Sequence, residues 1–175
     1  TYYVDDLRVN GVNRAIKVKT NAGGKAFNLC AALSKCNVPC VMTGFMAEGA
    51  DIFEKYLNGL NVQYDFIKAE GDIRTNIKIC DLKNNSFTDI NENSFNIDKS
   101  SEEKLYEKVS KLSCDCDIVY MGGSLPNGLN CDTYKKIISL CKNNGALTVL
   151  DASGEALKIG IEAKPHIIKP NKNEI

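Results

Sequence analysis

Short, continuous runs of apolar residues alternate with amphipathic stretches in the second half of the chain, and this alternation constrains the fold more than any other feature. The runs cover residues 118–121, 146–150 and 166–168. Runs of this length suit strands that are buried on both faces, as in parallel sheets. Because helical patterns separate them, the order strand–helix–strand predicts an α/β fold with helices on both faces of the sheet.

Four helices are expected where apolar residues recur at spacings of three and four. The third is preceded by Ser100-x-x-Glu103, a pattern typical of a capping box. The fourth is followed by Gly145, the residue type most common just after a helix. The four apolar stripes run through Leu29–Cys36, Ile52–Leu60, Leu105–Leu112 and Tyr134–Cys141.

Residues 73–91 have a different pattern, in which Ile77 and Ile79 alternate with polar residues, as in a half-exposed strand. The opening segment, through about Val18, also suits strands. We therefore predict a small antiparallel β lid made from residues 1–20 and 73–91. An α/β core would comprise residues 21–72 and 92–175, and both parts would belong to one domain spanning residues 1–175.

The composition is that of a globular protein, with 25% charged and 43% apolar residues. Lys+Arg and Asp+Glu are both 22, so the formal net charge is zero. A balanced charge argues against nucleic acid or a membrane surface as a partner. No run approaches the roughly 20 apolar residues of a membrane span, and the first residues lack a signal-peptide pattern. We therefore expect a cytoplasmic protein.

Eight cysteines fall mostly within apolar segments, and we expect them to be buried free thiols. Zinc binding is the alternative. The close pairs Cys36-x3-Cys40 and Cys114-x-Cys116 exist, but His166 is the one histidine and the usual structural zinc spacings are absent.

Glycine and polar residues follow each of the three predicted strands in the second half. In open α/β sheets, ligands bind beyond the carboxyl ends of the strands, so these junctions would converge on one edge of the sheet. Each alone could be an ordinary turn. Three together, one carrying a lysine, favour a phosphate or nucleotide site. The junctions are Gly122-Gly123-Ser124, Asp151-Ala152-Ser153-Gly154 and Lys169-Pro170-Asn171.

A second glycine-rich segment, Gly23-Gly24-Lys25, immediately precedes the first predicted helix. Paired glycines allow backbone N–H groups to approach an anion, and the helix N-terminus and Lys25 add positive charge. The segment is neither a Walker A loop nor a dinucleotide fingerprint. It therefore predicts an anion site, with a tight turn leading into a helix as the alternative.

Several of these motifs occur together in the order found in one family. The chain resembles the phosphofructokinase B (ribokinase-like) carbohydrate kinases, and within them the branch of 1-phosphofructokinase and tagatose-6-phosphate kinase. The resemblance covers nearly the whole chain. The matching segments are Val12–Ala15, Gly23–Asn28, Ile73–Ile79, Gly123–Gly128, Asp151–Leu157 and Ile168–Glu174.

This resemblance implies a ribokinase-like fold, with a three-layer Rossmann-type sheet and a small β lid. It implies transfer of a phosphoryl group from ATP, aided by Mg²⁺, to a ketohexose phosphate. Fructose 1-phosphate is the favoured acceptor, and tagatose 6-phosphate and fructose 6-phosphate are close alternatives. Lys25 and Arg74 argue against an uncharged acceptor, because such a substrate needs no paired cations.

The resemblance also assigns residues to the sugar phosphate. Arg74 would pair with its phosphate, for which the guanidinium fork is well suited. Arg14 would lie on the lid and could reach the substrate of its own or of a neighbouring subunit, and the alternative is a solvated strand face. The substrate-binding set is Gly23, Gly24, Lys25, Asn28, Arg74, Ser124 and Arg14.

Lys169 would approach the phosphates of ATP, and Asn171-x-x-Glu174 would place Mg²⁺, through water molecules, and the phosphates. Magnesium commonly keeps several waters, which suits an indirect contact. A helix capping box is the alternative explanation of Asn171-x-x-Glu174.

The chain departs from the family pattern in two respects. Ala26 stands where the family usually has glycine, a change that costs little unless that residue needs a positive φ. The family also has a strand ahead of the position of Thr1 and a C-terminal part beyond Ile175, which contains the catalytic base. We therefore expect an N-terminal fragment that dimerises through the lid and is inactive alone, or a non-catalytic fragment that binds sugar phosphate.

Overall fold

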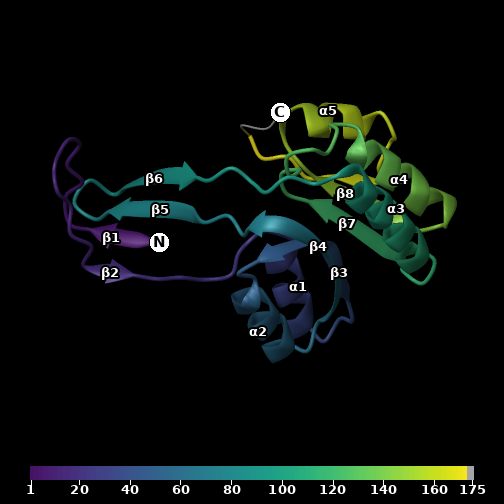
Figure 1. Ribbon diagram of the computed structural model, residues 1–175, viewed down its shortest axis with the longest axis horizontal. Helices are drawn as coiled ribbons and strands as arrows, with labels where there is room; N and C mark the ends of the chain where they lie inside the picture. Colours follow the sequence, from purple (N-terminus) through teal and green to yellow (C-terminus); the bar gives the residue numbers. More distant parts are fainter. Residues whose placement is uncertain (173–175) are drawn as a thin grey trace.

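A computed structural model of the protein describes residues 1–172, which form a core of helices and strands and a lid that projects from it (Figure 1). The core has a parallel three-stranded sheet of β7 (Ile118–Gly122), β8 (Leu147–Asp151) and β9 (Ile167–Ile168). Gly122 pairs with Asp151, and Leu150 pairs with Ile168. The three apolar runs are therefore confirmed as parallel strands, but both residues of β9 are exposed, so the prediction of burial on both faces is wrong for the third run.

Three helices accompany this sheet, namely α3 (Lys99–Ser113), α4 (Thr133–Asn143) and α5 (Gly154–Ile161). Ile138, Cys141 and Leu150 are completely buried where α4 packs against β8. Side chains alternate along a strand, so Leu150 faces these helices while Asp151 faces the other side of the sheet. The helix α5 was not predicted, because its apolar stripe spans only about two turns.

The first half of the core consists of α1 (Lys25–Lys35), β3 (Val41–Glu48), α2 (Asp51–Gly59) and β4 (Gln63–Asp72). The strands β3 and β4 are parallel, and a second apolar cluster around Phe27, Leu57 and Val62 joins them to α1 and α2. Both helices in this half were predicted from their apolar stripes, and both are confirmed.

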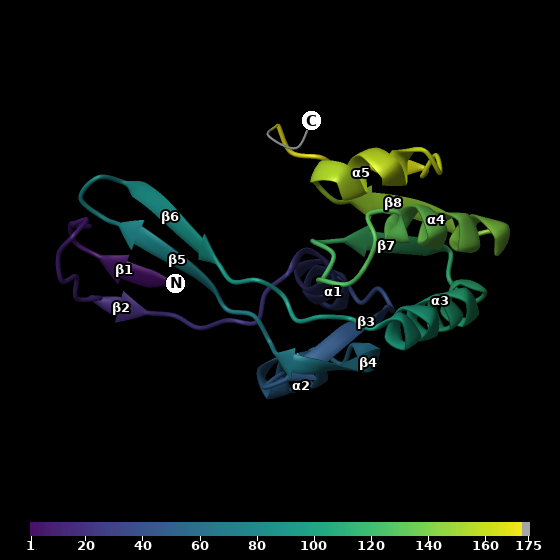
Figure 2. The same cartoon turned by 45° about the horizontal axis from the view of Figure 1, so that its top comes forward.

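Within residues 1–172, the core strands form two separate sheets, β3–β4 and β7–β8–β9. Helices connect the two: α1 contacts both β3 and β7, and Ile67 of β4 joins the apolar cluster of Leu105 and Val109 on α3. Figure 2 shows α1 beside β3 and below β7. The α/β class is confirmed, with the parallel sheet in two parts.

The lid is a four-stranded sheet in the order β2-β1-β5-β6, with β1 (Tyr2–Val4), β2 (Lys17–Val18), β5 (Asn76–Asp81) and β6 (Ser86–Asn91). The pairs β1–β2 and β5–β6 are antiparallel, as predicted. The pair β1–β5 is parallel, so the lid is a mixed sheet. A long connection through the core joins β1 to β5, and such a connection permits the parallel arrangement that a tight hairpin forbids.

Two local predictions need correction. The N-cap of α3 is Asp98, whose side chain accepts a hydrogen bond from the Ser101 backbone N–H at 2.6 Å, so the capping box proposed at Ser100 is wrong. All eight cysteines are free, but only Cys30, Cys80 and Cys141 are buried. The exposed ones lie at helix ends and in loops, where the chain meets solvent: Cys36, Cys114 and Cys131.

No helix within the described part of the chain is both long enough and apolar enough to cross a membrane.

Candidate functional site

Asp151, the last residue of β8, is the centre of a cluster of polar side chains at the carboxyl end of the three-stranded sheet. It is only 3% exposed. One carboxylate oxygen, Oδ1, lies 2.7 Å from Lys25 Nζ. The other, Oδ2, lies 3.1 Å from Lys169 Nζ and accepts a hydrogen bond from the Tyr120 hydroxyl at 2.7 Å. The structure thus brings together two lysines that lie 144 residues apart in the sequence.

Each member of this cluster is placed by a regular element. Lys169 follows β9, and its backbone N–H donates to Leu150 O at 2.9 Å, which continues the parallel ladder. Lys25 is the first residue of α1. Gly24, immediately before it, has φ of 137°, a conformation that side chains rarely allow. The positive end of the α1 dipole therefore lies at the same place as the lysines.

The electrostatics of Asp151 follow from these neighbours. Burial alone would raise the pKa of its carboxyl, but hydrogen bonds from Lys25, Tyr120 and Lys169 outweigh burial and hold that pKa below its usual value. Two ammonium groups therefore face one ionised carboxylate at neutral pH. A bound phosphate could replace the carboxylate as their partner, because both anions are recognised by the same charge-assisted hydrogen bonds.

A second pair of predicted residues meets beside this cluster. Arg74 lies between β4 and β5, where the chain passes from the core into the lid, and its Nη1 donates to Ser124 Oγ at 2.9 Å. Ser124 follows Gly123, whose backbone N–H donates to Asp151 O at 3.2 Å. The hydroxyl of Tyr134, on α4, donates to Gly123 O at 2.9 Å and holds the same segment from behind.

The remaining predicted residues differ in where they lie. Gly23 and Asn28 are exposed on either side of Lys25, at the start of α1. Ala26 lies within α1 and is not among the residues with positive φ, so its substitution for glycine is tolerated. Arg14 lies on the exposed loop between β1 and β2, at the end of the lid far from the core (Figure 1). The structure does not bring Arg14 to the Asp151 cluster.

The predicted nucleotide and metal residues lie at the end of the described chain. Asn171 is exposed and follows Lys169 by two residues. Glu174 lies outside the described residues. Within residues 1–172, no group of three or more His, Cys, Asp and Glu side chains could hold a metal ion. The assignment of Mg²⁺ to Asn171 and Glu174 therefore stays a prediction.

Sequence reasoning placed Asp151 at one of the three strand junctions without giving it an individual role, and it did not single out Tyr120. A signal for Asp151 existed: a carboxylate that ends a buried apolar strand needs a partner, because an unpaired buried charge is costly. Tyr120 gave no comparable signal, since a tyrosine within an apolar run is an ordinary core residue.

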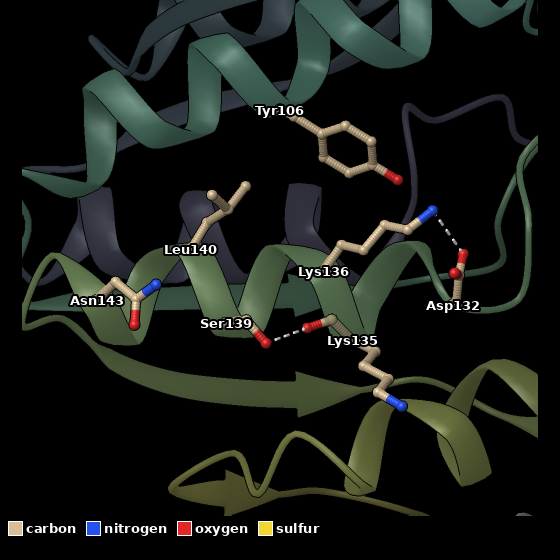
Figure 3. A pocket seen from close by; sticks show the side chains of 7 residues that line it. All are labelled: Tyr106, Asp132, Lys135, Lys136, Ser139, Leu140 and Asn143. Atoms are coloured by element: carbon tan, nitrogen blue, oxygen red, sulfur yellow. Dashed lines mark hydrogen bonds and ion pairs between the residues drawn. The ribbon is translucent and has the colours of Figure 1, made fainter.

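A separate groove of about 600 Å³ lies between α3 and α4 (Figure 3). Its lysines already have partners, Lys135 with Glu162 at 2.7 Å and Lys136 with Asp132 at 3.1 Å. The hydroxyl of Tyr106, which borders the groove, donates to Glu102 Oε1 at 2.5 Å. None of the predicted site residues lines this groove, so it is not part of the Asp151 cluster.

Comparisons with known proteins agree with the fold. The family profile described as "pfkB family carbohydrate kinase" matches residues 1–175. The chain is 33% identical over 178 residues to tagatose-6-phosphate kinase of Staphylococcus epidermidis, covering 100% of this chain and 57% of that protein. It is 34% identical over 174 residues to 1-phosphofructokinase of Bacillus subtilis, covering 99% of this chain and 56% of the relative.

A solved structure is similar over the same part. The protein, from Thermotoga maritima and described as a possible 1-phosphofructokinase, superposes with a TM-score of 0.88 at 27% identity, covering 98% of this chain and 56% of that one. The chain therefore spans a little over half the length of the relatives it matches.

Proposed function

Because the chain belongs to the pfkB family of carbohydrate kinases, we propose that it provides the sugar-phosphate site and part of the ATP site of a kinase that phosphorylates a ketohexose phosphate. Fructose 1-phosphate is the acceptor we favour, giving fructose 1,6-bisphosphate. The observation that carries this proposal is the meeting of Lys25 and Lys169 at Asp151.

The two lysines would bind the phosphate groups of different ligands. Lys25, at the N-terminus of α1, and the backbone of Gly23 and Gly24 suit the sugar phosphate. Lys169 is 70% exposed along its side chain and can turn toward the phosphates of ATP. Phosphoryl transfer depends mainly on positioning and on neutralising charge as it develops, and fixed ammonium groups supply both. When bound, Mg²⁺ would add charge neutralisation at the ATP phosphates, and Asn171 with Glu174 would hold it.

The guanidinium of Arg74 is the group we assign to the phosphate of the acceptor. Its hydrogen bond to Ser124 holds it at the carboxyl end of β7, and its fork can engage two phosphate oxygens at once. Asn28, one turn along α1 from Lys25, is a polar neighbour for the sugar hydroxyls.

Asp151 is poorly suited to be the catalytic base. A general base works best with a pKa near the working pH. Hydrogen bonds occupy both oxygens of Asp151, and its pKa is held below the usual value. We therefore propose that the 175-residue chain binds its ligands without turning over ATP. A non-catalytic role as a sugar-phosphate-binding or dimerising fragment is the alternative.

Tagatose 6-phosphate is the second candidate acceptor. The chain is 33% identical to the tagatose-6-phosphate kinase and 34% identical to the 1-phosphofructokinase, so identity does not separate the two. Fructose 6-phosphate is a third. All three carry the phosphate that Lys25 and Arg74 would bind.

We propose that the lid forms a homodimer in the cytoplasm. The residues on one face of its sheet, here called the apolar lid face, share one side of the paired strands. Ile90 is 52% exposed and Val18 is 52% exposed, which leaves apolar area for a second copy to cover. Arg14 would then serve its own or the neighbouring subunit. The face comprises Tyr2, Val18, Ile77, Ile79 and Ile90.

Calorimetric titration of the chain with fructose 1-phosphate, tagatose 6-phosphate and ATP tests the proposal. Loss of a charge-assisted hydrogen bond weakens binding by about 1.5–3 kcal/mol, which is roughly 10- to 150-fold. We expect Lys25→Ala and Arg74→Ala to lose sugar-phosphate affinity by this amount. Lys135→Ala, which removes an ion-paired lysine from α4, is the control.

Unchanged affinity in both Lys25→Ala and Arg74→Ala would contradict the assignment of the site. A second assay measures ADP release by the purified chain. Turnover that depends on the sugar phosphate would overturn the proposal that this chain is inactive alone.

A further inference from the structure

We propose that Tyr120 is a positioning residue of the candidate site, which holds the Asp151 carboxylate between Lys25 and Lys169. The inference deepens the proposed function and rests on it for the identity of the ligands. The geometry on which it stands is independent of those ligands.

Tyr120 lies on β7, two residues before Gly122, so both face the same side of the sheet. Gly122 pairs with Asp151 across the strands, and the Tyr120 side chain runs along β7 to place its hydroxyl 2.7 Å from Asp151 Oδ2. Lys169 Nζ approaches the same oxygen, and Lys25 Nζ approaches the other. Three donors from three elements thus fix the rotation of one carboxylate.

The course of the Tyr120 ring depends on the absence of a side chain at Gly122. A Cβ atom there would lie 2.5 Å from the Tyr120 hydroxyl oxygen and 2.6 Å from its Cε1. Both distances are well below van der Waals contact, so any side chain would push the ring away from Asp151. Tyr120 and Gly122 therefore act as a pair.

A tyrosine hydroxyl can donate a hydrogen bond to Asp151 without carrying a charge, which neither lysine can do. Burial and the hydrogen bond to Asp151 raise the pKa of Tyr120, so the phenol stays protonated and donates at neutral pH. It satisfies a buried carboxylate oxygen without adding a charge. When a lysine turns toward a phosphate, Asp151 keeps this hydrogen bond. Without the hydroxyl, the buried carboxylate would depend on the lysines alone and would hold them back from phosphate.

Affinity measurements test this role. We expect Tyr120→Phe, which removes only the hydroxyl, to weaken the binding of both fructose 1-phosphate and ATP by about tenfold, the effect of losing one hydrogen bond to a charged group. We expect Gly122→Ala to have a similar effect, although it keeps the hydroxyl. Tyr106→Phe is the matched control, because it removes a hydroxyl that donates to the carboxylate of Glu102 on α3.

A carbon-13 NMR titration of the Asp151 carboxyl gives a readout that needs no ligand and that general destabilisation would not produce. The groups that contact Asp151 are Lys25 from α1, Tyr120 from β7 and Lys169 after β9, and the Asp151 charge also raises the pKa of Tyr134 on α4. Since the Tyr120 hydroxyl helps to lower the Asp151 pKa, this pKa should rise in Tyr120→Phe and in Gly122→Ala. It should not change in Tyr106→Phe.

The two measurements separate the possible failures. An unchanged Asp151 pKa in Tyr120→Phe overturns the positioning role. A raised pKa together with unchanged affinity for both ligands overturns its importance for binding. If the unsubstituted chain binds neither ligand, the proposed function fails, whereas a raised pKa in Tyr120→Phe still supports the action of Tyr120 on Asp151.

Discussion

The lid and the second half of the core contain strands of similar length but bury them very differently. All six residues of β6 are exposed, whereas Thr148, Leu150 and Asp151 of β8 are buried. Figures 1 and 2 show helices packed over β8 and none over the lid strands. The strand β8 is therefore held by apolar packing, whereas β6 is held mainly by backbone pairing, and Val4 and Cys80 are buried on the neighbouring lid strands.

The polar contacts of the lid converge on Asp81, the last residue of β5. Asp81 is 6% exposed, and its side chain accepts hydrogen bonds from Leu7 N at 3.1 Å, from Asn84 N at 3.1 Å and from Asn84 Nδ2 at 2.9 Å. It connects the loop after β1 with the turn between β5 and β6. One carboxylate thus organises the end of the lid, where the core would use a cluster of apolar side chains.

Replacing isoleucine by alanine in the two regions should give the largest difference in the free energy of unfolding. Ile138 on α4 is 0% exposed, so Ile138→Ala leaves a cavity and should lower the free energy of unfolding by about 2–5 kcal/mol. Ile90 of the lid is 52% exposed, and Ile90→Ala should cost less than about 1 kcal/mol. Denaturant unfolding of the two variants measures both values. Equal losses would contradict the contrast between packed and exposed strands.

Acidification should loosen the end of the lid that Asp81 organises. Hydrogen bonds from the Asn84 side chain, and then from backbone N–H groups, lower the pKa of Asp81. A carboxyl with a lowered pKa in the folded state stabilises it above the unfolded pKa, and this stabilisation is lost as the pH falls through the folded value. Between about pH 6 and about pH 3, we expect hydrogen-exchange protection of Leu7 and Asn84 to fall while that of Ile138 persists.

The control for this acid effect is Asp81→Asn, which cannot ionise and should make lid protection low at every pH in that range. The neighbouring pair of Asp6 and Lys83, 2.8 Å apart, adds a contribution of the same sign, because Lys83 lowers the pKa of Asp6. Lid protection that stays constant down to about pH 3 would show that Asp81 does not organise this region.

The contrast between the two regions also explains what the sequence could predict. The strands β7, β8 and β9 were predictable because short continuous apolar runs are typical of strands in parallel sheets, although both residues of β9 are exposed. Strand partners were less predictable, since they depend on contacts between distant residues. The parallel pairing of Tyr2 with Ile79 and the division of the core strands into two sheets leave no local signature.

In the candidate site, too, features that are local in sequence could be predicted, whereas contacts between distant residues could not. Lys25, Lys169, Arg74 and Ser124 were identified from strand and helix junctions and from the family motifs, which are local in sequence. The contact between Tyr120 and Asp151 was not, because it requires the register of β7 against β8 and the space above Gly122. Both are tertiary facts about residues that individually look ordinary.

The variant with the smallest expected effect on stability tests whether the exposed lid forms a dimer interface. Ile90 and its strand partner Ile77 lie on the apolar lid face, while Asp89 lies on the opposite face, 3.6 Å from Lys78. Since Ile90 is half exposed, Ile90→Ser should change the free energy of unfolding by about 1 kcal/mol or less. In a lid dimer the same side chain would be buried, and a buried serine would weaken association.

Sedimentation velocity should therefore show Ile90→Ser shifted toward the monomer and Asp89→Ser unchanged. Equal behaviour of the two variants would exclude the apolar lid face as the dimer interface and would leave exposure of the lid strands without a role in assembly.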